Sequence, residues 1–154
     1  IDPSVIFYMM NSLNKSKREV SDLLNQESGM LGLTGDTDLR EILKKAANGN
    51  KECKNALDLA GYRIRKFIGA YTAILNGLDA IIFTAGIGEN SAEMRKLACA
   101  NLDFLGIHLD SEKNNVHAKE ILEIQSSSSK VKILVIPTNE EIEIAKQSYE
   151  LLNR

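Results

Sequence analysis

The most informative stretch of this sequence is AIIFTAGIGEN, residues 80–90. Its first five residues form a short apolar run without polar alternation, which is typical of a β-strand buried on both faces. Two glycines, Gly86 and Gly88, then separate this strand from a helix expected over residues 91–101. Glycines let a ligand approach the backbone, and free amides at a helix N-terminus favour an anion. The pattern therefore predicts a phosphate-binding turn in which the amides of both glycines face the ligand.

Other interpretations of this turn can be weighed from its neighbours. A Walker A loop requires a lysine followed by Ser or Thr after the second glycine, whereas Glu89 and Asn90 follow here, so a P-loop is excluded. A dinucleotide fingerprint needs a third glycine where Ser91 stands, and it belongs to an initial βαβ unit, which argues against half of a dehydrogenase. A plain strand-to-helix turn, capped by Asn90 or Ser91, stays open on the pattern alone.

A second stretch, VIPTNEE at residues 135–141, repeats this design. An apolar run over residues 131–136 predicts a strand, Pro137 ends it, and Asn139 suits the N-cap of a final helix. Glu140 and Glu141 have two interpretations: acidic residues favoured by the helix dipole, or ligands of Mg²⁺, which needs only one or two carboxylates beside a nucleotide. Ligands of open α/β sheets gather at the carboxyl ends of strands, and both stretches lie at such ends.

The third candidate is the glycine turn LTGDTDLR, residues 33–40, at the start of a helix expected to end near residue 47. Thr37 or Asp38 suits the N-cap of that helix. In one interpretation Arg40 stacks on a base or pairs with a phosphate. In the other, this is a capped surface turn in which Asp36 and Arg40 form an i,i+4 pair. Spacing alone leaves both open.

The clearest periodicity lies at residues 57–75, where apolar side chains recur at helical spacing and predict a long amphipathic helix. Gly61 and Gly69 lie eight residues apart on one side of it, where another backbone can approach closely. Further helices are expected over residues 5–14 and 16–26, and further strands over residues 107–109 and 121–124. Helices combined with short apolar strands indicate the α/β class.

Composition excludes several classes of protein. The 154 residues are 44% hydrophobic and 26% charged, which is typical of a globular domain. Nineteen basic and twenty-one acidic residues give a net charge of −2, so no whole-chain field attracts nucleic acid or an anionic membrane. No apolar run approaches the roughly 20 residues that span a bilayer, and we expect a soluble protein.

Single reactive residues carry little signal. Cys53 and Cys99 lie far apart without CxxC spacing, so we expect two buried thiols rather than a zinc site or a disulfide. His108 and His117 lack neighbouring carboxylates or a motif serine, which argues against catalysis or metal binding. The sequence begins with Ile1 and no signal peptide follows, which favours a piece of a longer chain.

Three segments of this chain resemble, in the same order, signature segments of the acetate kinase family. These segments are LTGDTDLR (residues 33–40), FTAGIGEN (83–90) and VIPTNEE (135–141), and the opening Ile1-Asp2-Pro3 resembles the sequence after that family's central catalytic segment. The resemblance covers essentially the whole chain but only the carboxyl-terminal part of such an enzyme. The family belongs to the actin, hexokinase and Hsp70-like phosphotransferases, which close two ribonuclease-H-like lobes on a nucleotide.

The resemblance implies a fold and a set of site residues. Residues 1–154 would form the second, nucleotide-binding lobe, with a mixed sheet flanked by helices that include one long amphipathic helix. Carried over by position, the residues bordering the adenosine would be Asp38, Leu39 and Arg40, those lining the phosphates would be Gly86, Ile87, Gly88, Glu89 and Asn90, and the magnesium carboxylate would be Glu140. The family's catalytic arginine and transition-state histidine would precede Ile1, so no catalytic residue lies in this segment.

The implied activity is reversible phosphoryl transfer from ATP to acetate, giving acetyl phosphate and ADP, with Mg²⁺ as the cofactor. Without the acceptor pocket this segment alone would be inactive, because phosphoryl transfer depends on in-line positioning. Propionate kinase shares the motifs, and a non-catalytic actin-like nucleotide-binding module is the alternative from another class. The resemblance further implies a cytoplasmic homodimer that binds neither nucleic acid nor membrane.

Overall fold

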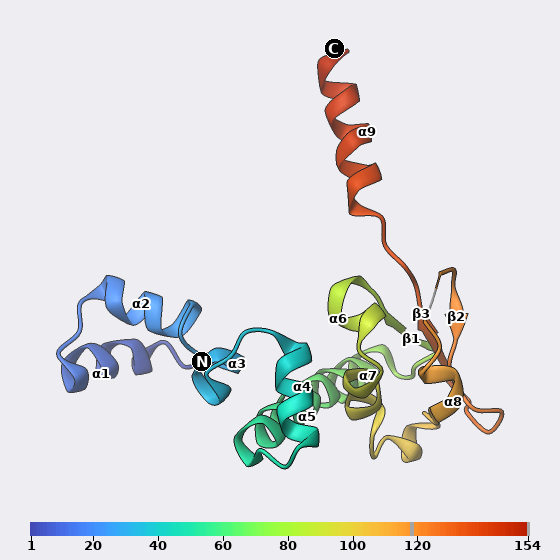
Figure 1. Cartoon of the computed structure of the whole chain (residues 1–154), viewed down its shortest axis with the longest axis horizontal. Helices are drawn as coiled ribbons and strands as arrows, with labels where there is room; N and C mark the ends of the chain where they lie inside the picture. Colours follow the sequence, from blue (N-terminus) through green and yellow to red (C-terminus); the bar gives the residue numbers. More distant parts are fainter. Residues whose placement is uncertain (118, 154) are drawn as a thin grey trace. The chain divides into compact units, whose positions relative to one another are not determined.

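The computed structural model describes residues 1–117 and 119–153 of the chain (Figure 1). The elements follow in the order α1 (Ser4–Leu13), α2 (Lys17–Asn25), α3 (Gly29–Thr34), α4 (Leu39–Ala47), α5 (Lys51–Leu75), β1 (Ala80–Phe83), α6 (Ala85–Asn90), α7 (Ala92–Cys99), a 3₁₀ turn (Asp103–Leu105), α8 (Ser111–Asn114), β2 (Leu122–Glu123), β3 (Lys132–Val135) and α9 (Glu140–Leu152). They form two compact units, residues 1–59 and 60–154, and the division falls within α5.

The first unit is helical, and polar side chains cap the beginnings of α2 and α4. Ser16 and Glu19 form a capping box at α2, each bonding the backbone of the other. The Asp38 carboxylate accepts the Arg40 N–H at 2.9 Å and caps α4. Asp38 is one of the two residues expected as this cap. Five side chains of these helices are at most 5% exposed: Val20, Ile42, Cys53, Ala56 and Leu57.

The second unit is built on a three-stranded mixed sheet in the order β1-β3-β2. β1 runs parallel to β3 in the register Ala80↔Lys132 to Phe83↔Val135, and β2 pairs antiparallel with β3. Side chains of the strands and of the segments beside them form one buried cluster, which includes Ile81, Ile107, Ile124 and Ile133. The expected α/β fold with a mixed sheet flanked by helices is confirmed.

The strands are shorter than the sequence predicted. Of residues 107–109, only Leu109 pairs, in an isolated bridge with Gln125. The expected strand over residues 121–124 is reduced to β2, and the run over residues 131–136 to β3. Backbone groups join a ladder only where a partner strand lies opposite them, and apolar composition alone does not supply that partner.

β1 was predicted to be buried on both faces, and that prediction is wrong for the described residues. Ile81 is 9% exposed on the core face, whereas Ile82, which points the other way, is 56% exposed. The open face borders an apolar cavity of about 420 Å³ whose lining includes Ile64, Ile68 and Phe83. Only one face of this strand is covered by packed elements of its own unit.

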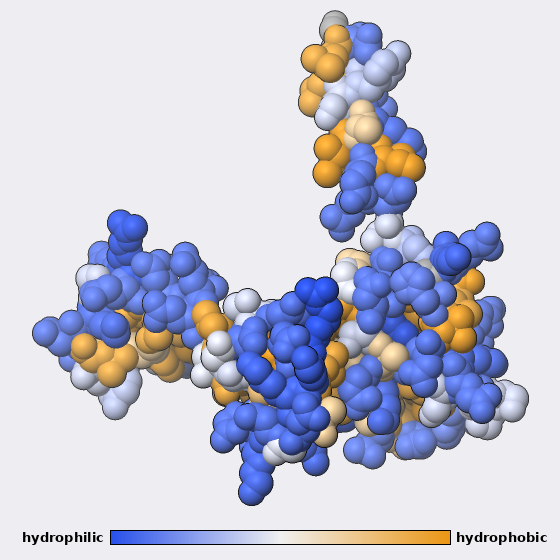
Figure 2. Space-filling view, viewed as in Figure 1, coloured by the Kyte–Doolittle hydropathy of each residue, from blue (hydrophilic) through white to orange (hydrophobic). Residues whose placement is uncertain are grey.

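The long helix is confirmed and begins earlier than expected, at Lys51, because Asn50 caps it by accepting the Cys53 N–H at 2.8 Å. Toward its end apolar side chains remain exposed: Phe67 and Tyr71 stack with ring centroids 6.2 Å apart and are each more than half exposed. The helix α9 carries exposed apolar side chains as well (Figure 2). Within the described residues, no helix combines the length and hydropathy that a membrane crossing requires.

The two glycines of α5 turn out to have different surroundings. A Cβ added at Gly61 would lie 2.7 Å from the Cβ of Leu97 and 3.2 Å from the Leu97 carbonyl, so α7 approaches α5 at this position. The Leu97 carbonyl also accepts from Arg65 Nη1 at 3.0 Å. A Cβ at Gly69 would meet nothing within 4 Å. The expected close backbone approach is therefore confirmed at Gly61, whereas Gly69 lies beside open space.

We predict that Gly61→Ala lowers the free energy of unfolding by about 2 kcal/mol, because the added methyl group must push α7 away from α5. Gly69→Ala is the matched control in the same helix, and its better helix propensity should raise stability by up to about 1 kcal/mol. Urea unfolding of the 154-residue chain, followed by circular dichroism, measures both. Equal effects of the two substitutions would contradict the packing assigned to Gly61.

Candidate functional site

The carboxyl ends of β1 and β3 meet at one edge of the sheet, as the sequence predicted. The parallel ladder continues beyond the strands, because Ile136 N–H donates to the Phe83 carbonyl at 2.9 Å. Beyond this point lies a cavity of about 180 Å³. Its lining residues come from both strand ends: Ala85, Gly86, Glu89, Thr138, Glu140 and Glu141. Two stretches about fifty residues apart in the sequence therefore form one site.

The turn that the sequence predicted after β1 is a short helix, α6, which contains both glycines. Thr84 precedes it in an extended conformation, and its hydroxyl donates to the Ile136 carbonyl at 2.9 Å instead of capping α6. Ala85 then takes a left-handed φ of 58°, a strained value for a residue with a Cβ. Because the first amides of a helix have no intrahelical partner, this uncapped turn offers N–H groups to a ligand.

Gly86 and Gly88 have different positions, although both were expected to present amides. Gly86 lines the cavity, and a Cβ added to it would meet nothing within 4 Å. At Gly88 a Cβ would lie 3.2 Å from the Phe83 carbonyl carbon, so this glycine lets α6 pack against the end of β1. In a helix that begins at Ala85, the amides of Ala85, Gly86 and Ile87 have no intrahelical partner, and that of Gly88 falls inside the helical pattern.

Glu89 joins the two strand ends. Its Oε1 accepts both the N–H of Thr138 at 2.9 Å and the hydroxyl of Thr138 at 2.8 Å. These bonds hold the pKa of the Glu89 carboxyl below its ordinary value of 4.5, so the stabilisation they give is complete above that pH and is lost as the pH falls through the lowered pKa. These two bonds hold the stretch after β3 beside the turn after β1.

Glu140 begins α9 and lines the cavity with Glu141. The cap of α9 is Asn139, which accepts the Ile142 N–H at 3.0 Å and confirms the expected capping residue. Among residues 1–117 and 119–153, no three His, Cys, Asp or Glu side chains cluster as metal ligands. A divalent cation at this edge would take Glu140 as a carboxylate ligand together with oxygen atoms of the bound anion and water, a donor set that suits Mg²⁺.

A buried arginine that the sequence did not single out holds the end of α6. Arg95 of α7 is 3% exposed, and its Nη1 donates to the carbonyls of Gly88 and Glu89, both at 2.8 Å. Its Nε and Nη2 donate to the side-chain and main-chain oxygens of Asn114 at 2.8 and 2.6 Å. Burial lowers the pKa of Arg95. The guanidinium thereby fixes the last carbonyls of α6, and nothing in the local sequence distinguished it from a surface arginine.

The cap of α7 and the thiols agree with the sequence. Ser91, one of the two expected capping residues, accepts the Met94 N–H at 3.3 Å. Asn90 instead donates to the Gly86 carbonyl at 3.0 Å within α6. Cys53 and Cys99 are free and buried, as expected. Burial raises the pKa of the Cys99 thiol to about 12, so it is protonated and unreactive at neutral pH.

The third candidate, at the start of α4, differs from its expected geometry. Arg40 does not pair with Asp36; its Nε and Nη2 contact the two carboxylate oxygens of Asp38 at 3.0 and 2.6 Å. Asp36 instead accepts from Lys45 Nζ at 2.9 Å. The expected i,i+4 pair is wrong because Asp38, held as the N-cap, is in reach of the guanidinium. Paired in this way, the Asp38 carboxyl has its pKa lowered to about 2.

The predicted residues thus fall into two groups. Gly86, Glu89 and Glu140 line one cavity in the second unit, with Ile87 more than half exposed on the same turn. Asp38, Leu39 and Arg40 belong to the first unit, where Leu39 is half-buried and Arg40 is exposed.

The sequence profile of the acetokinase family matches residues 1–146. An acetate kinase of Flavobacterium johnsoniae is 59% identical over 152 residues, which cover 99% of this chain and 39% of that protein. The crystal structure of Porphyromonas gingivalis acetate kinase superposes with a TM-score of 0.87 at 37% identity, covering 99% of this chain and 38% of that one. A propionate kinase structure from Francisella tularensis gives 0.84 at 41% identity, covering 94% and 37%.

We predict that Arg95→Met lowers the free energy of unfolding by about 3 kcal/mol, because it leaves the carbonyl oxygens of Gly88 and Glu89 and the side-chain and main-chain oxygens of Asn114 without their donor. Hydrogen exchange of the α6 amides should accelerate at the same time. Arg63→Met, at an exposed position of α5, is the matched control and should change stability by less than about 0.5 kcal/mol. Similar losses in both variants, or unchanged exchange in α6, would refute the support assigned to Arg95.

Proposed function

The chain belongs to the acetokinase family, and from this premise we propose that the protein containing it transfers the terminal phosphoryl group of ATP to acetate, giving acetyl phosphate and ADP, and catalyses the reverse reaction. The chain spans about 39% of the length of the Flavobacterium relative. The observation that carries the proposal is the shared cavity at the ends of β1 and β3, which brings an uncapped helix N-terminus and the Glu140 carboxylate together. Such a pair suits a polyphosphate and its cation.

In this proposal the nucleotide phosphates lie against the turn formed by Gly86, Ile87, Gly88, Glu89 and Asn90. Three features support it: Gly86 leaves room for a ligand beside the backbone, Thr84 does not cap the helix, and Arg95 holds the carbonyl end of the turn from behind. The free amides point their positive ends at the anion, and the rigid support means that little ordering is required when the ligand binds.

We further propose that Glu140 holds Mg²⁺ beside those phosphates. Glu89 lines the same cavity, but one of its oxygens is occupied by two hydrogen bonds from Thr138, which favours Glu140 as the ligand. When bound, the cation neutralises negative charge on the phosphates and so favours transfer of the terminal group. The chain's own part is to place this carboxylate at the strand end by capping α9 with Asn139.

The adenosine, in the same proposal, is bordered by Asp38, Leu39 and Arg40. The side chain of Arg40 is 88% exposed and carries the donors that a ribose or a phosphate accepts, while the bidentate Asp38 pair fixes its direction. We place the acyl pocket and the catalytic arginine and histidine outside this segment. Residues 1–154 then act as a nucleotide-binding lobe that supplies ATP and Mg²⁺ contacts.

The propionate kinase structure, at a TM-score of 0.84, favours a second candidate substrate. Propionate is larger than acetate by one methylene, and one methylene in an apolar pocket changes specificity by about 10- to 200-fold. The relative kcat/KM for acetate and propionate, measured on the full-length protein, decides between the two.

We predict acetate-dependent ADP formation from Mg-ATP by the full-length protein, measured in a coupled spectrophotometric assay. The rate of the 154-residue chain alone should be at least ~100-fold lower, because no group positions the acceptor in line.

Glu140→Gln in the full-length protein should raise the Mg²⁺ concentration needed for half-maximal activity by about tenfold.

The isosteric control is Glu143→Gln, in the same turn of α9 but outside the cavity lining. If both variants respond alike to Mg²⁺, the metal assignment is wrong. If the full-length protein binds Mg-ATP but phosphorylates neither carboxylate, the protein is a non-catalytic nucleotide-binding module.

We propose that the full-length protein is a homodimer. The exposed apolar side chains along α5, among them Phe67 (51% exposed), Tyr71 (57%) and Ile74 (77%), support an interaction surface. Light scattering of the full-length protein should therefore give twice the mass of one chain. A monomeric mass at micromolar concentration would overturn this proposal.

A further inference from the structure

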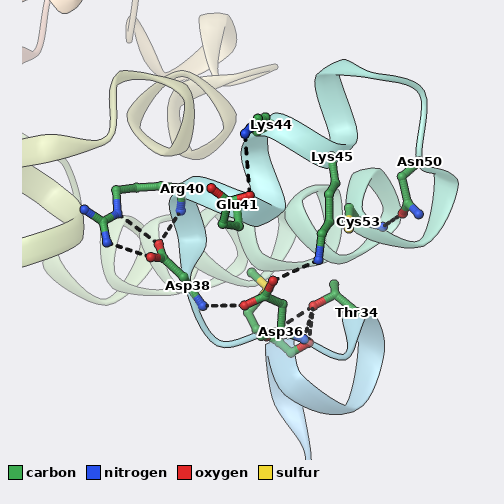
Figure 3. A network of polar contacts seen from close by, with 10 residues as sticks. Thr34, Asp36, Asp38, Arg40, Glu41, Lys44, Lys45, Asn50 and Cys53 are labelled. Atoms are coloured by element: carbon green, nitrogen blue, oxygen red, sulfur yellow. Dashed lines mark hydrogen bonds and ion pairs between the residues drawn. The ribbon is translucent and has the colours of Figure 1, made fainter.

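The segment between α3 and α4 carries a series of polar contacts that ends at Arg40 (Figure 3). α3 closes at Gly35, whose φ of 71° is a left-handed value that glycine adopts without strain. The Thr34 hydroxyl accepts the Asp36 N–H at 3.2 Å and donates to the Met30 carbonyl at 2.8 Å. These contacts turn the chain so that the Asp36 side chain faces α4.

The Asp36 carboxylate links the two ends of α4. Its Oδ2 accepts from Lys45 Nζ in the last turn at 2.9 Å, and its Oδ1 accepts the N–H of Asp38, the N-cap residue, at 3.0 Å. The Asp36 side chain is 24% exposed and that of Lys45 is 46% exposed. The pair lowers the pKa of Asp36 and raises that of Lys45, so both are charged at neutral pH.

The Asp38 carboxylate in turn holds the side chain of Arg40. Its two oxygens hold Nε and Nη2 of the guanidinium, while its Oδ1 also accepts the Arg40 N–H. Nη1 of Arg40 has no partner among the described residues and faces solvent. Arginine forks bind phosphate or ribose oxygens only when their plane is correctly directed, so the contacts behind the fork determine what its free edge meets.

We infer that Asp36 and Lys45 are positioning residues for nucleotide binding: acting through Asp38, they hold the free edge of the Arg40 guanidinium in the direction that the nucleotide requires. This inference rests on the proposed function of the Asp38–Arg40 site. An exposed fork that is fixed before the ligand arrives loses less conformational entropy on binding, and that difference appears in affinity. Asp36 and Lys45 do not contact the nucleotide themselves.

The test uses steady-state kinetics of the full-length protein and its Lys45→Met variant. Loss of the ammonium should raise the KM for Mg-ATP about fivefold and leave kcat and the KM for acetate within about twofold, because the reacting phosphoryl group is not touched. Lys45→Arg retains the charge and reach and should restore the KM for Mg-ATP to within about twofold of wild type.

Lys44→Met is the matched control, since Lys44 is the preceding residue and its ammonium lies 3.9 Å from Glu41, away from Asp36. It should leave every parameter within about twofold of wild type. Asp36→Asn tests the other partner: it should raise the KM for Mg-ATP as Lys45→Met does, and the double variant Asp36→Asn/Lys45→Met should be no worse than either single one.

The variant Arg40→Ala distinguishes the nucleotide contact of Arg40 from the positioning of its side chain. If Arg40→Ala leaves the KM for Mg-ATP unchanged, the proposed nucleotide contact at this site is wrong. If Arg40→Ala raises that KM but Lys45→Met does not, the positioning inference alone is overturned. A melting temperature that falls in Lys45→Met together with kcat and both KM values, without rescue by Lys45→Arg, would assign the pair a structural role and also overturn the inference.

Discussion

The candidate site depends on the parallel pairing of β1 with β3. Parallel strands end at the same edge of a sheet, so the register that places Phe83 opposite Val135 also places the two following turns side by side. Hydrogen bonds beyond the strands, from Ile136 to Phe83 and from Thr84 to Ile136, extend this alignment to the cavity. A different register would separate Gly86 from Glu140.

Two polar contacts keep the turns in place once the sheet has brought them together. The Glu89 carboxylate accepts the N–H of Thr138, and the Arg95 guanidinium donates to the carbonyls of Gly88 and Glu89. The helix N-terminus between them stays uncapped, because the Thr84 hydroxyl bonds to Ile136 instead. The carbonyls of Gly88 and Glu89 and the Glu89 carboxylate thus have partners, while the Gly86 end of α6 lines the cavity.

In the proposed function, the exposed apolar surface of the second unit packs against other parts of the full-length protein. Ile82 on the open face of β1 and the side chains near the end of α5 are exposed, although their spacing in the sequence is that of a buried strand and a core-facing helix. The spacing of apolar residues reflects every partner that a strand or helix packs against. Predicted and observed burial therefore agree only when all of those partners are present. The share of the relatives' length that this chain covers, 38–39%, fits that explanation.

The sequence by itself determined most element types and most of the caps, because hydrophobic period, Asp38, Ser91 and Asn139 act through neighbours within four residues. The exceptions are α6, where a turn was predicted, and residues 107–109, where a strand was predicted. It also placed Gly86 and Glu140 at strand ends, a local property. Only the tertiary structure decided which partners met over long distances. Arg95 donates to Asn114, nineteen residues away, and Asp36 pairs with Lys45 instead of the expected Arg40. Such contacts depend on how helices pack, and packing is set by many weak apolar interactions at once rather than by any spacing along the chain.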